Sequence, residues 1–358
     1  MKFKLKEICT VDWGDTSLTK KSYVENGRYL GVSAGGCDGR MDYYNFEAFT
    51  PVISAIGANC GKMFLPEEPF VAIKNTITLN PNKEISGKYL FYAMVNNHIP
   101  HRGGGQPFIS KADTEEYEIP CPIIDRQQEI VDILDKTKSI IDARKQQLQQ
   151  LDDLVKARFV EMFGDPVNNS KGLPELTLPE LGEFGRGVSK HRPRNDPKLL
   201  GGKYPLIQTG EVANSELYIT NYENTYSELG LKQSKMWQAG TLCITIAANI
   251  AKTAILTFDA CFPDSVVGFK ANDKTNNIFI HYWFSFFQAI LEAQAPESAQ
   301  KNINLKILSE LKIIVPPIEQ QNEFASFVEQ VDKLKATVQK ALDEAQTLFD
   351  SLMQEYFG

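Results

Sequence analysis

The sequence predicts an α+β protein in which two globular domains of mixed helix and strand are separated by two long helices that form an antiparallel coiled coil, with a pseudo-two-fold internal repeat. Three observations support this fold class. The second half of the chain repeats the first, each half ends in a long stretch with helical periodicity, and the preceding segments contain short runs rich in β-branched and aromatic residues. We divide the chain into a first domain (1–120), a first long helical segment (121–165), a second domain (166–317) and a second long helical segment (318–358).

The internal repeat is clearest at the end of each half, where the two copies align without a gap at one constant offset. Chance does not readily produce an ungapped match of this length, so we interpret it as a duplication. Matched pairs include Pro122 and Pro316, Gln127 and Gln321, Glu129 and Glu323, Leu148 and Leu342, Leu154 and Leu348, and Phe163-Gly164 and Phe357-Gly358. Shorter matches at smaller offsets pair Tyr29 and Gly35 with Tyr204 and Gly210, and Ala58-Asn59 and Lys62 with Ala248-Asn249 and Lys252.

Each long helix is predicted to follow a proline stop, because proline lacks a backbone donor and disfavours helix in the residue before it. Asp125 and Glu319 then place an acid in the first turn, where the helix dipole favours negative charge. A helix over residues 125–163 would be about 57 Å long at ~1.5 Å per residue.

Both helical segments carry heptad patterns. In the second, the predicted seam consists of Phe324, Phe327, Val331, Leu334, Val338, Ala341, Ala345, Leu348 and Leu352. In the first, Leu134, Ile141, Leu148, Val155 and Met162 recur every seven residues, Ile130, Ile133, Ile140 and Leu151 flank them, and Arg144 and Gln147 interrupt one seam. The alternative is a pair of core helices in one compact domain, but both segments far exceed the usual ~11–12 residues of a globular helix. We therefore expect the two helices to pack on each other as a spacer.

The globular domains contain the expected signals for short strands. In the first domain, the N-terminal residues and the runs 52–56 and 70–79 predict strands, and residues 88–97 predict a helix. In the second, the runs 242–248 and 254–258 predict buried strands, and residues 279–293 predict a helix.

The net charge of −7 is concentrated in the helical segments. Residues 125–165 hold 7 Lys and Arg against 9 Asp and Glu, and residues 318–358 hold 3 against 8. Residues 1–124 hold 13 against 14, and residues 166–317 hold 15 against 14. The globular domains are therefore close to neutral and can each carry a basic face.

Composition indicates a globular protein of the cytoplasm. The apolar content is 42% and the charged content 23%, and no apolar run approaches the ~20 residues needed to span a bilayer. The six cysteines lack the paired spacing of a disulfide framework or a zinc site, so we expect reduced thiols. The N-terminal residues lack the apolar core of a signal peptide.

Four segments together resemble a known family. Each domain ends in a proline-bounded strand followed by an acid and glutamines: Ile119-Pro120-Cys121-Pro122-Ile123-Ile124-Asp125-Arg126-Gln127-Gln128 and Ile313-Ile314-Val315-Pro316-Pro317-Ile318-Glu319-Gln320-Gln321. The first helix leads out through Phe159-Val160-Glu161-Met162-Phe163-Gly164-Asp165-Pro166, and the second domain contains Gly201-Gly202-Lys203-Tyr204-Pro205-Leu206-Ile207-Gln208-Thr209-Gly210. Over essentially the whole chain, this layout resembles the DNA-specificity subunits of Type I restriction-modification enzymes. The first domain departs from it, with Tyr29-Leu30-Gly31-Val32-Ser33-Ala34-Gly35 in place of the second domain's segment.

The resemblance implies a non-catalytic subunit that directs partner enzymes to DNA. Each globular domain would be a target-recognition domain that reads one half of a split sequence in double-stranded DNA. The helices would fix the gap between the halves and dock two modification subunits, which carry S-adenosylmethionine and methylate adenine. Restriction subunits would complete the ATP-driven nuclease.

DNA reading needs donors and acceptors at base edges and cations on phosphates. The richest segment, 185–203, holds seven basic residues against one acid, and its glycines and proline predict a loop. The candidates in the second domain are Arg186, Lys190, His191, Arg192, Arg194, Lys203, Gln208, Thr209, Asn249 and Lys252. Those in the first domain are Lys20, Lys21, Arg28, Arg40, Asn59, Lys62 and Arg102, the last in a glycine-rich loop (102–105). The alternatives are a solvated basic loop and, for Asn59 and Asn249, turn residues that bond nearby backbone.

No catalytic, metal or cofactor site is predicted. An adenine methyltransferase needs an Asp/Asn-Pro-Pro-aromatic loop for the flipped base, whereas Pro316-Pro317 is followed by isoleucine. His98 and His101 have the spacing of metal ligands, but no Cys/His cluster accompanies them. Two other functions stay open: a coiled-coil adaptor without a DNA role, and a stand-alone modification or nuclease enzyme with a divergent site.

Overall fold

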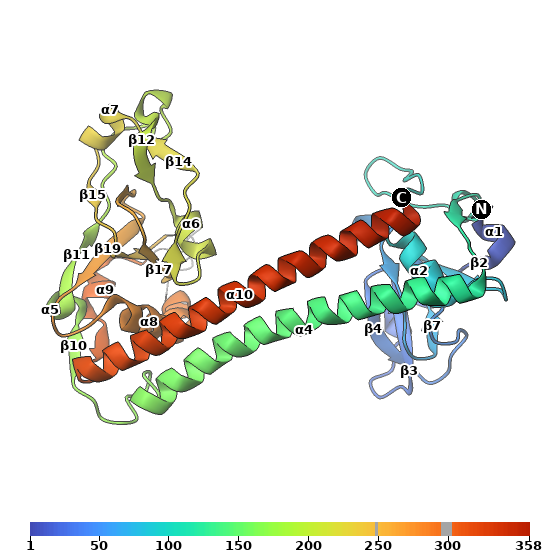
Figure 1. Ribbon diagram of the computed structural model, residues 1–358, viewed down its shortest axis with the longest axis horizontal. Coiled ribbons are helices and arrows are strands. Elements are labelled where there is room, and N and C mark those ends of the chain that lie inside the picture. Colours follow the sequence, from blue (N-terminus) through green and yellow to red (C-terminus); the bar gives the residue numbers. More distant parts are fainter. Residues whose placement is uncertain (248–249, 295–302) are drawn as a thin grey trace. The chain divides into compact units, whose positions relative to one another are not determined.

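The computed structural model describes residues 1–247, 250–294 and 303–358. Its contacts divide the chain into a first unit, Met1–Gln146 with Val338–Gly358, and a second unit, Gln147–Thr337. Each unit contains one globular domain and a part of each long helix, α4 (Ile124–Phe163) and α10 (Ile318–Phe357) (Figure 1). The two long helices expected from the heptad patterns are thus confirmed.

In the first unit, three small sheets and three short α-helices precede α4. The strands are β1 (Lys2–Lys4), β2 (Cys9–Trp13), β3 (Tyr29–Ser33), β4 (Gly36–Met41), β5 (Val52–Ser54), β6 (Met63–Phe64), β7 (Phe70–Ala72), β8 (Thr76–Pro81) and β9 (Glu118–Pro120). The helices are α1 (Leu5–Ile8), α2 (Gly87–Val95) and α3 (Lys111–Glu115). The single run predicted over 70–79 is two strands, because the chain turns at Asn75, which has a positive φ of 69°.

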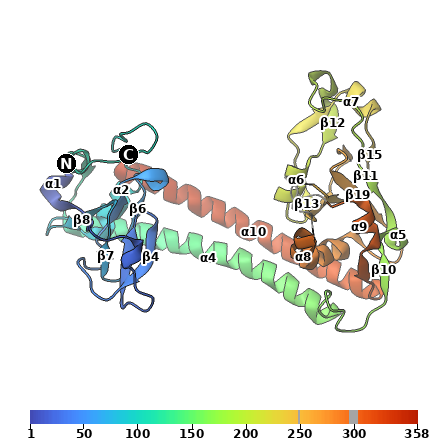
Figure 2. The same ribbon diagram turned by 180° about the vertical axis from the view of Figure 1, so that it is seen from behind.

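The second unit has the same plan with more elements. Its strands are β10 (Glu175–Thr177), β11 (Gly182–Arg186), β12 (Leu200–Leu206), β13 (Tyr218–Ile219), β14 (Asn224–Tyr226), β15 (Met236–Trp237), β16 (Leu242–Thr245), β17 (Thr253–Leu256), β18 (Ala260–Cys261), β19 (Val266–Ala271) and β20 (Lys312–Ile314). Its helices are α5 (Leu178–Leu181), α6 (Thr209–Asn214), α7 (Glu228–Lys232), α8 (Asn277–Gln294) and α9 (Leu305–Glu310). Within this unit, β12, β14 and α7 lie at the end farther from the long helices (Figures 1 and 2).

Strand order demonstrates the internal repeat. The larger sheet is β2-β8-β5-β6 in the first unit and β11-β19-β16-β17-β13 in the second. In the smaller sheet, β3 pairs antiparallel with β4 and parallel with β7, and β12 pairs antiparallel with β14 and parallel with β18. A short antiparallel pair, β1 with β9 or β10 with β20, precedes each long helix. The two domains are therefore two copies of one topology.

A buried glutamine at the start of each long helix makes hydrogen bonds that are repeated in the two units. The Gln127 amide donates to the carbonyls of Glu84 (2.7 Å) and Pro122 (2.8 Å) and accepts from the Ser86 amide (2.9 Å). This side chain is wholly buried, so the satisfied amide fixes the helix start to the turn before α2.

Gln321 makes the equivalent contacts in the second unit. Its amide donates to the carbonyls of Lys274 (3.0 Å) and Pro316 (2.8 Å) and accepts from the Thr275 hydroxyl (2.8 Å) and, more weakly, the Asn276 amide (3.3 Å). The two glutamines matched in the sequence thus make corresponding hydrogen bonds, and each fixes the start of its long helix to its domain.

Within each unit, the two helix parts run antiparallel and share a core with the domain. In the second unit, Phe159 contacts Phe324 (ring centroids 5.3 Å) and Phe279 of α8 (5.4 Å), and Arg158 bonds Glu323 (3.0 Å). In the first unit, Ile130, Val131 and Leu134 pack in one cluster with Phe349, Leu352 and Met353. Burying one large apolar side chain contributes about 1.5–3 kcal/mol, so these clusters hold the helix ends to their domains.

Two of the nine positions in the predicted seam of α10 are wrong, because the inward row is shifted there by one residue, to Lys335 and Phe349. The other seven are buried or half-buried: Phe324, Phe327, Val331, Val338, Ala341, Ala345 and Leu352. Leu334 and Leu348 are instead 56% and 53% exposed. In α4, Leu134, Ile141 and Val155 are buried as expected, whereas the flanking Ile133 and Ile140 are exposed.

Candidate nucleic-acid interface

The basic segment of the second domain lies between β11 and β12, and only its middle is a loop. We predicted a loop over 185–203, but Gly185 and Arg186 belong to β11, where they pair with Gly268 and Val267. A 3₁₀ turn, Pro197–Leu199, leads into β12, which contains Lys203. The loop proper is residues 187–196, which we name the basic loop.

Side chains from distant segments hold the basic loop in one conformation. The side-chain oxygen of Gln233 accepts hydrogen bonds from two successive backbone amides, those of Lys190 (2.7 Å) and His191 (3.1 Å). The Ser234 hydroxyl donates to the Val188 carbonyl (2.7 Å). A loop ordered in this way loses less conformational entropy when it binds a ligand.

Three of the candidate DNA contacts take part in holding the loop. Arg194 forms an ion pair with Asp264 (2.5 Å), and Arg192 donates to the Ser189 carbonyl (2.6 Å). His191 lies 3.1 Å from the Asp196 carboxylate. The Lys198 amide, and then the His191 ring, stabilise that carboxylate and lower the pKa of Asp196. Much of the loop's charge is thus offset within the fold.

Other cations of this region are exposed and unpaired. Among the described residues, Arg186, Lys190 and Lys198 form no ion pair, and all three are exposed. Lys203 is shared between Glu228 (3.4 Å) and the Tyr204 ring (5.2 Å to its centroid). The loop therefore presents unpaired cations beside Arg194, which pairs with Asp264, and Arg192, which lies 3.7 Å from the same carboxylate.

A recess of about 340 Å³ adjoins the basic loop. Gln208 and Thr209, both sequence candidates, line it together with Arg194. Sequence reasoning missed four further polar residues in its wall: Ser189, Asn195, Asn224 and Ser265. They come from the loop, β14 and the turn before β19, and no local pattern connects these segments.

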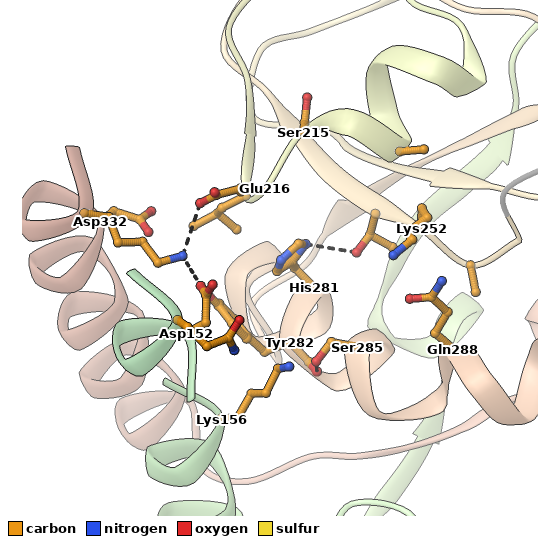
Figure 3. A pocket seen from close by; sticks show the side chains of 16 residues that line it. Asp152, Lys156, Ser215, Glu216, Lys252, His281, Tyr282, Ser285, Gln288 and Asp332 are labelled. Carbon is orange, nitrogen blue, oxygen red and sulfur yellow. Dashed lines mark hydrogen bonds and ion pairs between the residues drawn. The ribbon is translucent and has the colours of Figure 1, made fainter. Parts of the chain in front are cut away.

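Lys252 lines a different cavity, of about 380 Å³, among α4, α8, α10 and β17 (Figure 3). Lys252 is exposed and forms no ion pair among the described residues. Asn249, its predicted neighbour in the site, lies outside the described residues. The structure thus separates Lys252 from the recess that contains Gln208 and Thr209.

The cavity of Figure 3 is organised around Lys335, whose side chain is only 12% exposed. Its ammonium pairs with Asp152 of α4 and lies 3.1 Å from Glu216. Burial alone lowers its pKa, but the two carboxylates outweigh burial and raise the pKa of Lys335. Burial also raises the pKa of the neighbouring Asp332 carboxyl. These contacts tie α10, α4 and the second domain together within the second unit.

His281 is neutral in the same cavity. Burial, and then the charge of Lys335, lower its pKa to about 4. Its Nδ1 lies 2.9 Å from the Thr253 hydroxyl (Figure 3). Lys335 and His281 thus find their partners within this cavity.

In the first unit, most candidates are engaged in internal contacts. Lys20 pairs with Asp38 (2.6 Å), Arg40 with Glu68 (2.9 Å) and Arg102 with Asp113 (2.6 Å). The Asn59 side-chain amide donates to the Ala34 carbonyl (3.2 Å), 25 residues earlier, so it joins two separate segments and is not a local turn bond. Among the described residues, Lys21 forms no ion pair, and Arg28 and Lys62 lie over Tyr29 and Phe64 (5.4 and 5.8 Å to the centroids).

In the parts of the chain that the structure describes, no group of three or more His, Cys, Asp or Glu is placed to hold a metal ion. All six cysteines are free thiols. Of the helices in the described ranges, none is long and apolar enough to cross a membrane.

Comparison with known proteins assigns the family. The family model of the Type I restriction modification DNA specificity domain matches residues 1–153 and 175–346. The EcoDI specificity subunit of Escherichia coli is 22% identical over 96% of this chain and 86% of its own length. The MjaX specificity subunit of Methanocaldococcus jannaschii is 23% identical over 73% of this chain, a match that spans only 65% of that relative's length.

Solved structures show that the fold is shared. The Type I restriction-modification S subunit from M. genitalium has a TM-score of 0.65 at 17% identity, covering 100% of this chain and 96% of that one. A chain from a study of complex assembly and conformational transition in the type I R-M system has a TM-score of 0.61 at 15% identity, covering 100% and 97%. With the family model matching both halves, the chain belongs to the Type I restriction-modification DNA specificity family.

Proposed function

We propose that the protein is the sequence-reading subunit of a Type I restriction-modification complex and that it recognises a two-part target in double-stranded DNA. The observation that carries the proposal is the duplicated topology, because it gives each half of the chain its own domain and its own polar loops. The exposed cations Arg186, Lys190 and Lys198 supply phosphate contacts for the second half. The site of action would be the cytoplasm, where the DNA is.

The partners would be two modification subunits and the restriction subunits, which supply methyl transfer and cleavage, while this chain has no catalytic role. Exposed apolar side chains on the long helices support a repeated docking surface. Ile140 and Leu154 of α4 are 45% and 47% exposed, and their counterparts in the repeat, Leu334 and Leu348 of α10, are 56% and 53% exposed. An apolar stripe that occurs once on each helix fits two copies of one partner.

DNA binding by the chain assembled with its modification subunits tests the proposal. We expect binding to a target duplex that exceeds binding to a scrambled duplex by at least about a thousandfold, the lower end for specific readers. The logarithm of the affinity should fall linearly with the logarithm of salt concentration. Equal binding to both duplexes would support an adaptor without a reading role, and methyl transfer by the chain alone would support a stand-alone enzyme.

A further inference from the structure

The recess beside the basic loop contains polar groups that the protein itself does not satisfy. Ser189 is 6% exposed, and its buried hydroxyl has no hydrogen-bond partner among the described residues. Within the same described ranges, the side-chain amides of Asn195 and Asn224 also form no hydrogen bond. Buried polar groups in folded proteins normally find partners, so the Ser189 hydroxyl indicates a place for a ligand atom. Asn195 is exposed and Asn224 half-buried, so their amides can bond a ligand without breaking an internal contact.

The cavity around Lys335 provides the internal comparison (Figure 3). It is of similar size, about 380 Å³, but Lys335 is paired with Asp152 and Glu216, and His281 with Thr253. These paired groups hold elements of the fold together. The recess differs because the side-chain amides of Asn195 and Asn224 and the hydroxyl of Ser189 have no hydrogen-bond partner among the described residues.

The chemistry of the recess is neutral and mixed. Its apolar wall includes Leu200, Leu206 and Pro263, and its one cation, Arg194, is neutralised by Asp264. A phosphate would require an unpaired charge, so this surface is unsuited to the DNA backbone. Amide groups beside apolar surface instead match a base pair, because Asn and Gln bond the N6 and N7 atoms of adenine while apolar groups contact the methyl of thymine. Both features lie on the major-groove edge of one A·T pair.

We propose that this recess reads an A·T pair in the half-site of the second domain, with Asn195 and Asn224 as the adenine-reading residues. The inference rests on the proposed DNA-reading function and extends it to a base and to residues. Ser189 supplies a further donor and acceptor, and the surrounding cations Arg186 and Lys190 hold the backbone.

The first domain lacks this chemistry at the equivalent place. Ser33 stands where the second domain has Gln208, and its hydroxyl donates to Asp38 (2.8 Å), which also pairs with Lys20 (2.6 Å). Its polar groups are satisfied internally. The two halves of the target would therefore be read by different contacts, although the domains share a topology.

The test uses the full chain assembled with its modification subunits. The methylated sequence is first mapped in cells that express the wild-type complex, and then in cells that express Asn195→Ala, Asn224→Ala or the control Asn221→Ala. Asn221 is an exposed amide of the same domain that lines another hollow. We expect Asn195→Ala and Asn224→Ala to make the same A·T position degenerate in one half-site, while Asn221→Ala leaves the sequence unchanged.

Duplexes with modified bases then test the contact itself. With 7-deazaadenine at the degenerate position, which removes the N7 acceptor, wild-type affinity should fall about tenfold, the order of one bidentate base contact. The Asn224→Ala complex should bind the normal and modified duplexes equally, because the variant and the base change remove the same interaction. 2-Aminopurine at this position lacks the N6 amine, so the complex is measured at saturating protein, where its fluorescence should stay quenched, as for a stacked base.

Four outcomes would overturn the inference: no degenerate position, degeneracy at a G·C pair, an equal loss of affinity for all sequences, or strong 2-aminopurine fluorescence from an extruded base. Ser189→Ala guards against a folding artefact, because removing an unsatisfied hydroxyl should not lower thermal stability without DNA. Failure of the proposed function itself looks different, since the wild-type complex would then show no sequence-specific binding or methylation.

Discussion

Replacing Gln321 by leucine tests how the second domain is fixed to the start of its long helix. The substitution keeps the volume and removes the amide. The carbonyls of Lys274 and Pro316 and the amide of Asn276 would then be buried without this partner. Each unsatisfied group costs about 1–3 kcal/mol.

The expected loss of stability follows from two opposing effects. At the lower end of that range the three backbone groups cost about 3–4 kcal/mol. The buried leucine recovers about 1 kcal/mol, because its site is already shielded from water. The net destabilisation is therefore about 2–3 kcal/mol, or roughly 5–10 °C in Tm for a unit of this size.

Urea denaturation followed by tryptophan fluorescence measures this change, because Trp237 and Trp283 are buried in the second unit. Gln320→Leu is the matched control: Gln320 is the exposed neighbour, and its replacement should change stability by less than about 0.5 kcal/mol. Gln127→Leu should destabilise the first unit by a similar amount. A Gln321→Leu protein as stable as the Gln320→Leu protein would refute the structural role assigned to the repeated glutamine.

Four further predictions concern binding, pH and spacing. Arg186→Ala with Lys190→Ala should lower the magnitude of the salt slope of DNA binding by roughly 2 without relaxing the sequence read, and an unchanged slope would remove these cations from the interface. The folded-state pKa of His281 is about 4, below its ordinary value of 6.5, so the free energy of unfolding should be highest above pH 6.5 and decline as pH falls toward 4. The loss is at most about 3 kcal/mol, and smaller if the half-buried ring reaches water. His281→Asn should reduce the dependence of Tm on pH between pH 7.5 and 5.5. A variant whose Tm falls as steeply as that of the wild type would contradict the lowered pKa of His281. Leu334→Ser with Leu348→Ser should weaken assembly with modification subunits at least tenfold in titration calorimetry while leaving the fold intact. Assembly with the wild-type affinity would show that this apolar stripe is not the docking surface. Adding one heptad to both long helices should change the gap in the methylated sequence and preserve both half-sites, and an unaltered gap would refute the spacer role.

Most of the architecture could be predicted from the sequence, because the patterns that indicate it are local or repeated. An ungapped duplication needs only one comparison of the chain with itself, and the 40-residue helices show their heptads over many turns. The matched glutamines, Gln127 and Gln321, could be identified as important before their hydrogen bonds were seen. Strand order within each sheet depends on pairing between distant segments, which no local pattern shows.

The shifted row of α10 shows where local reasoning fails. Apolarity favours Leu334 over Lys335 as an inward position, yet Lys335 is the less exposed of the two. Asp152 and Glu216, far away in the sequence, satisfy its charge and allow its burial. A pattern of apolar residues cannot include a lysine whose partners lie on other elements.

The same reason limits prediction of the interface. The cationic segment was visible as a cluster, but the sequence does not show that Asp264, which follows β18, pairs with Arg194. Asn195 and Asn224 had no distinguishing neighbours in sequence, and only the fold brings them to one recess. Charge is thus a signal that the sequence shows for candidate phosphate contacts, whereas the proposed base-reading residues are brought together only by the fold.

The central claim, that two copies of one fold read two half-sites, is tested most directly by mapping methylated adenines across the genome of cells that express this chain with its modification subunits. The account predicts one split sequence, with two specified parts on either side of a gap of constant length. A continuous sequence without a gap, or a methylation pattern identical to that of cells lacking the chain, would contradict it.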